Sequence, residues 1–157
     1  MKKLKPYIIS VFIAILTGGI SALLTKGNMD IYETINTPTL SPPSLLFAIV
    51  WTLLYALMGV SAAMVYLEPT ATDRKKQNAL FTYAVSLFVN FLWSIIFFNM
   101  RAYLFAFLWL VLLEFLIIKT ILEYNDINKI AAYLQIPYAV WVAFAGYLNL
   151  GILILNK

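Results

Sequence analysis

The chain has 157 residues, of which 63% are apolar and 11% are charged, with a net charge of +4. A soluble domain averages about 45–50% apolar and about 25% charged residues, so this composition excludes an ordinary water-soluble domain. The chain has no histidine and no cysteine, the usual ligands of zinc, copper, iron–sulfur clusters and haem iron. We therefore expect no disulfide, no metal site and no protein-bound cofactor.

Five apolar runs follow one another along the chain, each with the roughly 20 residues that a membrane-spanning helix requires. None shows the polar and apolar alternation of a barrel strand. Because unpaired backbone groups are costly in hydrocarbon, the sequence predicts an all-α bundle of five transmembrane helices in a single domain, residues 1–157. The predicted spans are residues 7–24, 45–67, 79–98, 102–122 and 130–155.

The first connection, residues 25–43, is much longer than the polar breaks at 68–78, 99–101 and 123–129. Short connections join antiparallel neighbours, so we expect successive helices to be antiparallel. The long loop ends in a proline-rich stretch, in which Ser41 and Pro42 predict the N-cap and first turn of the second helix. This loop should deliver the chain into that helix at a fixed angle.

Basic residues are distributed unequally between the two sides of the predicted bundle. The side of the N-terminus has Lys2, Lys3, Lys5, Arg74, Lys75, Lys76, Lys119 and Lys129, and the other side has Lys26, Arg101 and Lys157. By the positive-inside rule, the N-terminus is cytoplasmic and the C-terminus lies outside. The basic residues form no stripe, so no nucleic-acid partner is expected. The first run is interpreted as a span rather than a signal peptide, because it has no A-x-A cleavage site.

Aromatic and amide side chains recur on one face of the second, third and fifth predicted helices, at the spacing of helical turns. These stripes are Trp51, Tyr55 and Met58; Asn90, Trp93, Ser94 and Phe97; and Tyr138, Trp141, Ala145, Leu148 and Asn149. Trp and Tyr also anchor helices at the headgroup level. Trp51, however, lies about seven residues or 10 Å inside its span, which favours a shared cavity over anchoring.

Three further residues inside the spans require an explanation. Asn90 either makes an interhelical hydrogen bond, worth ~0.6 kcal/mol on average in membrane proteins, or faces a ligand, and both interpretations stay open. Glu114 is the only carboxylate well inside a span, and its role is left open because no second intramembrane acid accompanies it. Pro137 removes a backbone hydrogen bond and is expected to kink the fifth helix.

Four short motifs follow one another in the same chain order as the spans. They are Pro42-Pro43, the run from Trp51 to Gly59, Asn90-x-x-Trp93, and residues 137–149, which begin Pro-Tyr-x-x-Trp and end Leu-Asn. In this order and spacing the sequence resembles the TspO/MBR family of tryptophan-rich sensory or translocator proteins over nearly its whole length. One position departs from the family pattern, since Leu40 stands where relatives place a tryptophan.

The resemblance implies a bacterial plasma-membrane protein that binds porphyrins, above all protoporphyrin IX, and sterol-like or benzodiazepine-type compounds, as a tetrapyrrole sensor or scavenger. It also implies that the first loop covers the pocket, and that Trp51 and Trp141 take part in light-dependent porphyrin breakdown. The residues expected to bind the ligand are Leu40, Pro42, Pro43, Trp51, Tyr55, Asn90, Trp93, Ser94, Phe97, Tyr138, Trp141, Phe144, Ala145, Leu148 and Asn149. With Leu40 in place of tryptophan, the loop offers apolar contact but less stacking.

Two other classes of function stay open. A transporter of porphyrins or sterol-like metabolites commonly shows inverted repeats with matching broken helices, which five spans and one interior proline do not indicate. A structural or partner-binding membrane subunit would use its aromatic faces against other helices. Gly18 with Ala22 and Ala102 with Ala106 form small-xxx-small pairs that permit close packing, so a homodimer is expected.

Overall fold

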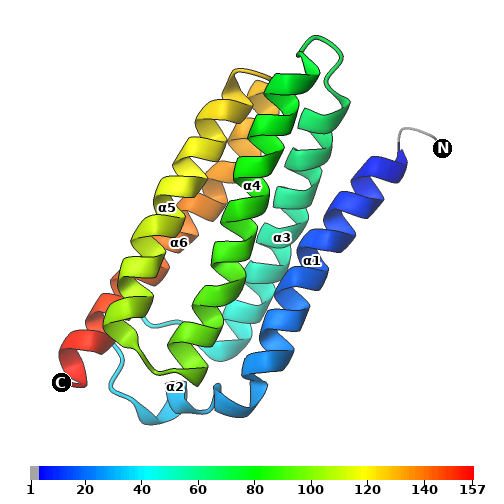
Figure 1. Cartoon of the computed structure of the whole chain (residues 1–157). Helices are drawn as coiled ribbons and strands as arrows, with labels where there is room; N and C mark the ends of the chain where they lie inside the picture. Colours follow the sequence, from blue (N-terminus) through cyan, green and yellow to red (C-terminus); the bar gives the residue numbers. More distant parts are fainter. Residues whose placement is uncertain (1–3) are drawn as a thin grey trace.

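The computed structural model describes residues 4–157, a range that contains helices and no strand. Five of the helices are long and apolar enough to cross a membrane, and they form a single bundle with the two termini at opposite ends (Figure 1). These are α1 (Leu4–Thr25), α3 (Ser44–Leu67), α4 (Asp73–Ser94), α5 (Tyr103–Asn125) and α6 (Lys129–Leu155). The predicted all-α fold with five spans is confirmed.

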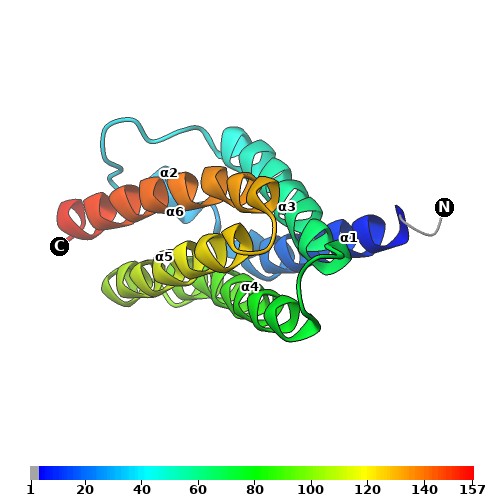
Figure 2. The same ribbon diagram turned by 90° about the horizontal axis from the view of Figure 1, so that it is seen from above.

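The helices are arranged in two pairs with α1 at one side. Seen from above (Figure 2), α3 lies beside α6 and α4 lies beside α5. The closest packing joins α5 to α6 and α1 to α3. Two glycines permit the second of these contacts, because a Cβ atom at Gly59 would overlap the backbone of Val11 and one at Gly18 would overlap the ring of Tyr55.

One residue of each small-xxx-small pair predicted to support a dimer is used within one chain. Gly18 receives the Tyr55 ring, and Ala106 is fully buried inside the bundle. Neither residue presents an open helix face to a second copy. The homodimer itself stays a prediction.

The start of α4 lies well before the predicted position, at Asp73 rather than residue 79. The hydroxyl of Thr72 caps the helix by accepting a hydrogen bond from the Lys75 N–H at 3.4 Å. Lys76 pairs with Asp73 one turn further, at 3.3 Å. A hydrophobicity-based boundary missed this polar first turn, because the helix begins before its apolar stretch.

The predicted N-cap of the second span is also wrong. Helix α3 begins at Ser44, and Pro43 occupies the position before it, where its carbonyl accepts from the Leu46 and Phe47 N–H groups at 2.9 and 3.4 Å. Ser41 instead turns its hydroxyl back to the Pro38 carbonyl, at 2.7 Å. The loop therefore makes its own tight turn before the helix starts.

The long loop contains a 3-10 turn, η1 (Lys26–Asn28), and the short helix α2 (Ile31–Thr34). Its second half is attached to α6, because Asn36 and Asn156 exchange two hydrogen bonds of 2.9 and 2.8 Å. Tyr147 donates a third to the Thr39 carbonyl at 2.9 Å. The loop consequently lies against the end of the bundle near the C-terminus (Figure 1).

Candidate ligand pocket

A cavity of about 310 Å³ occupies the half of the bundle next to the long loop, between α1, α3, α4 and α6. This volume lies at the lower end of the range typical of small-molecule sites, roughly 300–1,000 Å³. None of the residues from 4 to 157 that line it has a charged side chain. The wall consists of aromatic rings, small residues and a few amide and hydroxyl groups, a composition suited to an apolar ligand with a few oriented polar contacts.

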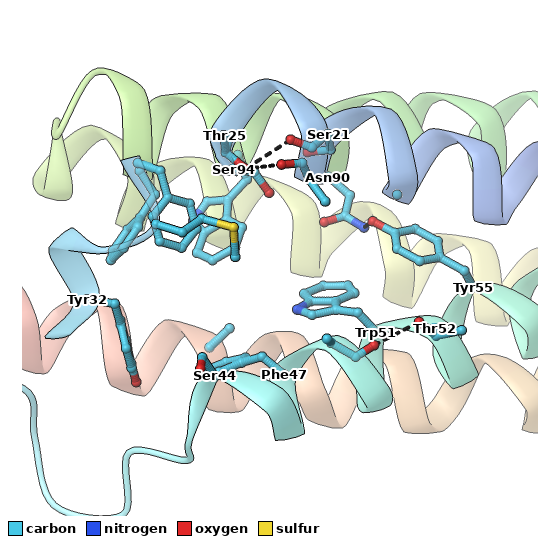
Figure 3. Close-up of a pocket in the computed structure, with 18 of the residues that line it drawn as sticks. Ser21, Thr25, Tyr32, Ser44, Phe47, Trp51, Thr52, Tyr55, Asn90 and Ser94 are labelled. Carbon is cyan, nitrogen blue, oxygen red and sulfur yellow. Dashed lines mark hydrogen bonds between the residues drawn. The ribbon is translucent and has the colours of Figure 1, made fainter. Parts of the chain in front are cut away.

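Trp51 forms the aromatic wall of the cavity on α3. Its indole stacks on the ring of Tyr55, with centroids 5.7 Å apart and planes 30° apart, and meets the edge of Tyr138 at 6.3 Å. In Figure 3 the indole lies across the cavity from Asn90 and Ser94 of α4. Two neighbouring rings therefore hold the Trp51 indole in place with one edge and face available to a ligand.

Asn90 lies on the opposite wall and is 2% exposed. Its Nδ2 donates a hydrogen bond of 3.1 Å to the Tyr55 hydroxyl oxygen, and the residue also lines the cavity. The two interpretations left open by the sequence are therefore compatible in one geometry, because the amide ties α4 to α3 and still borders the space a ligand would occupy.

Trp93 is positioned by a chain of amide contacts. Its Nε1 donates to the Asn149 Oδ1 at 3.4 Å, and the Asn149 Nδ2 donates to the Tyr103 carbonyl at 2.8 Å. An indole N–H buried without a partner is costly, so this chain fixes the ring orientation while linking α4, α5 and α6.

The end of α4 continues as a π-helical turn, η2 (Ile95–Asn99). Such turns occur often at functional sites, where they change which side chains share a face. Here the consecutive residues Phe97 and Phe98 both line the cavity. Phe97 also packs against Trp93 at 5.4 Å and Tyr103 at 5.2 Å, which makes this corner of the pocket rigid.

Most of the residues predicted from sequence lie together around the cavity. These are Trp51, Tyr55, Asn90, Trp93, Ser94, Phe97, Ala145, Leu148 and Asn149. Their part in ligand binding stays a prediction.

The remaining predicted residues do not line the cavity. They are Leu40, Pro42, Pro43, Tyr138, Trp141 and Phe144. Trp141 stands behind Phe47, with ring centroids 5.7 Å apart, and Tyr138 stands behind Trp51. Leu40 adopts a left-handed conformation, with φ of 72°, and is 77% exposed. The expected apolar contact from Leu40 to the cavity is therefore absent.

The sequence prediction missed the contribution of α1 and of the first half of the loop. Helix α1 lines the cavity with Gly18, Ser21, Ala22 and Thr25 among others, and the Ser21 hydroxyl donates to the Phe91 carbonyl of α4 at 3.2 Å. The helical spacing of these small residues could have indicated a shared face in the sequence. None of them, however, has the aromatic or amide side chain by which the other walls were identified.

Tyr32 of α2 closes the loop side of the cavity. Its ring packs edge to face with that of Phe47, with centroids 5.6 Å apart (Figure 3). Burial raises the pKa of the Tyr32 hydroxyl above its ordinary value of 10.0. The side chain therefore stays neutral at physiological pH and keeps the pocket free of charge.

Comparison with known proteins agrees with the resemblance seen in the motifs. The sequence model of the TspO/MBR family matches residues 9–155. The tryptophan-rich protein TspO of Chlorobaculum tepidum is 38% identical over 80% of this chain and 78% of its own length. The protein CrtK of Rhodobacter capsulatus is 32% identical over 88% and 85%, and the translocator protein of Bos taurus is 31% identical over 85% and 80%.

Proposed function

The chain belongs to the TspO/MBR family of membrane proteins, and we propose that its cavity binds a porphyrin, above all protoporphyrin IX, or another flat apolar compound. The observation that carries this proposal is the Trp51 indole, stacked on Tyr55 and exposed to an uncharged cavity. Aromatic faces bind planar rings through offset stacking and edge contacts, in addition to the burial of apolar area.

The charge distribution suits a porphyrin that enters ring first. Burying a carboxylate without a partner is costly, so the propionate groups should stay at the mouth of the cavity. Lys26 and Arg101 are exposed, and each is close in sequence to residues that line the cavity at the loop end of the bundle. Since the chain offers neither histidine nor cysteine to an iron atom, we favour a metal-free porphyrin and a site that works without a cofactor.

Light-dependent breakdown of the bound porphyrin forms a second part of the proposal. Of the two tryptophans implied by the family, Trp51 borders the ligand space, whereas Phe47 separates Trp141 from it. We expect light and molecular oxygen to supply the reactivity, with Trp51 as the side chain in contact with the ring. Trp141 would act through the position of Phe47.

We further propose that the protein serves as a tetrapyrrole sensor or scavenger in a bacterial plasma membrane, with the N-terminus inside. Support comes from the first turns of α4 and α6, which contain Arg74, Lys75 and Lys129; both helices start at the end of the bundle where the described chain begins (Figure 1). Because the chain has no cysteine, the single substitutions Thr70→Cys and Thr39→Cys test the orientation. Only Thr39→Cys should react with a membrane-impermeant thiol reagent added to intact cells.

The binding proposal is tested by titrating the purified protein with protoporphyrin IX and following porphyrin fluorescence. The sharpest pair of variants places a tryptophan at each of two exposed alanines, Ala48 on the cavity wall and Ala143 on the outer face of α6. Ala48→Trp fills the cavity and should weaken binding at least ~10-fold, whereas Ala143→Trp should bind as the parent protein does. Unsaturable binding, or equal weakening in both variants, would refute the proposal.

Turnover is tested separately, by comparing porphyrin absorbance in light and in darkness at saturating protein. Decay that needs light and the folded protein is expected to slow strongly in Trp51→Phe and only slightly in Trp141→Phe. Equal decay in the parent protein and in both variants would remove the catalytic part of the proposal and leave binding intact.

A further inference from the structure

A second hollow, of about 520 Å³, lies between α1, α3 and α4 at the opposite end of the bundle from the aromatic cavity. The N-terminal part of α1 leans away from the other helices there (Figures 1 and 2). We call this hollow the N-terminal groove, lined by Lys5, Pro6, Ile9, Ser10, Ile13, Ala62, Ala63, Tyr66, Leu80 and Tyr83. It shares no residue with the aromatic cavity.

The N-terminal groove has a polar mouth and an apolar interior. Lys5 lies near the start of α1 and the exposed Tyr66 lies near the end of α3, so both belong to the headgroup level of a membrane. Deeper along the groove, Ile9 and Ile13 face Ala62, Ala63 and Leu80. The two alanines leave the space that larger side chains would fill.

Lys5 has no acidic partner within 4.0 Å in residues 4–157, where the ion pairs are Lys76 with Asp73 and Lys119 with Glu123. The mouth of the groove therefore has an uncompensated positive charge at the level where lipid phosphate groups lie, which attracts an anion.

The length of the groove matches one leaflet. From Lys5 to Ile13 the helix advances about 12 Å at ~1.5 Å per residue, close to half of a hydrocarbon core that is about 30 Å thick. A molecule whose charged end lies at Lys5 and whose apolar chain extends to Ile13 therefore spans most of a single leaflet.

We propose that the N-terminal groove is a specific site for an anionic glycerophospholipid from the leaflet on the N-terminal side. The phosphate lies at the Lys5 ammonium, the Tyr66 and Ser10 hydroxyls donate to the phosphate or ester oxygens, and one acyl chain lies along Ala62, Ala63 and Ile13. The site is independent of the porphyrin proposal, because its residues and its ligand are different.

The proposal is tested by native mass spectrometry of the full chain in detergent, equilibrated with phosphatidylglycerol or with phosphatidylcholine. The variants are Lys5→Gln, which removes the charge, and Ser10→Phe, which fills the groove from its half-exposed side. Their matched controls are Lys129→Gln, at an exposed lysine on the same side of the membrane, and Thr17→Phe, further along α1 and outside the groove. Inorganic phosphate is added in a separate arm.

The parent protein should retain one phosphatidylglycerol in preference to phosphatidylcholine, and phosphate alone should not compete. Lys5→Gln should reduce that preference about 5-fold, the effect expected of one lysine near a charged lipid surface, and Ser10→Phe should abolish retention. Both controls should match the parent protein. Equal retention of the two lipids, unchanged retention in Ser10→Phe, or displacement by phosphate would overturn the proposal. If Ser10→Phe does not fold, Lys5→Gln still tests the proposal, because it changes only an exposed side chain.

Discussion

Buried polar residues join two helices directly at one end of the bundle and surround a cavity at the other. At the end away from the loop, α3 and α6 meet in a seam formed by Ser61, Ala131 and Gln135, each no more than 1% exposed. The Ser61 hydroxyl donates to the Ala131 carbonyl at 2.7 Å and accepts from the Gln135 Nε2 at 3.2 Å. At the loop end, buried amides bind tyrosine and tryptophan side chains around a cavity.

The difference between these ends comes from the size of the surrounding side chains. In the seam, Ser61 and the neighbouring alanines are small enough for two helix backbones to approach, as is typical of membrane helix contacts. Around the cavity, the rings of Trp51, Trp93 and Phe97 cannot interdigitate closely, so space is left between the helices. The seam should therefore determine stability, and the cavity should determine binding.

The largest expected effect comes from Trp51→Ala at the cavity. Loss of the stacking face should weaken protoporphyrin IX binding by about 2 kcal/mol, or roughly 30-fold in Kd, with little change in thermal stability. Fluorescence titration measures the first quantity and a melting curve in detergent the second. Trp109→Phe is the control for porphyrin binding, because Trp109 does not line the cavity. A large loss of stability in Trp51→Ala would contradict the separation of roles.

An effect of the opposite kind, and smaller, is expected from Ser61→Ala in the seam. The change keeps a similar volume but leaves the Ala131 carbonyl and the Gln135 amide without their partner, which should cost about 1–2 kcal/mol of unfolding free energy. Denaturation in mixed detergent measures this loss. Porphyrin affinity should be unchanged, and an affinity change of tenfold or more would mean that the two ends are coupled.

The attachment of the loop to α6 should slow the dissociation of a bound porphyrin. Asn156→Ala removes both hydrogen bonds to Asn36, which at an exposed site should be worth about 1 kcal/mol together. Porphyrin dissociation, followed by stopped-flow fluorescence, is expected to become about 5-fold faster. Asn125→Ala, an exposed change at the other end of the bundle, should have no effect; unchanged dissociation in Asn156→Ala would show that the loop does not retain the ligand.

The smallest expected effect is a pH dependence outside the membrane, at the end of the seam. Hydrogen bonds from Asn128, at 2.9 Å, and from Thr70, at 2.8 Å, lower the pKa of Glu68 below its ordinary value of 4.5. A lowered pKa means that this contribution to stability is present above pH 4.5 and is lost as the pH falls through the folded-state value. Melting temperatures should be measured from about pH 6 to about pH 3, a range that includes the ordinary carboxyl pKa. They should fall less in Glu68→Gln than in the parent protein.

The five helices could be predicted from the sequence because hydropathy over some twenty residues is a strong, local signal. Helix ends could be predicted less well, since they depend on single contacts. The Thr72 cap places the start of α4 in a polar segment, and the Pro38–Ser41 turn delays the start of α3. Both contacts are set by side-chain geometry that composition does not report.

The pocket was predicted in part for a similar reason. A helical stripe is about 100° wide or more, so spacing identifies a face without showing which member of it reaches the cavity. Trp51 and Ala145 do so, whereas Trp141, on the same stripe as Ala145, is covered by Phe47. The α1 wall was missed because its residues are distinctive only for being small.

The π-helical turn at Ile95–Asn99 makes one pocket wall sensitive to residue number as well as to residue identity. Each residue of an α-helix rotates the following side chains by about 100°. A single-residue deletion in this turn would restore regular helix and swing Phe98 out of phase with Trp93, even though every ring of the wall remained in the chain. Insertions and deletions at this turn are thus a form of variation that could reshape the pocket while leaving its composition untouched.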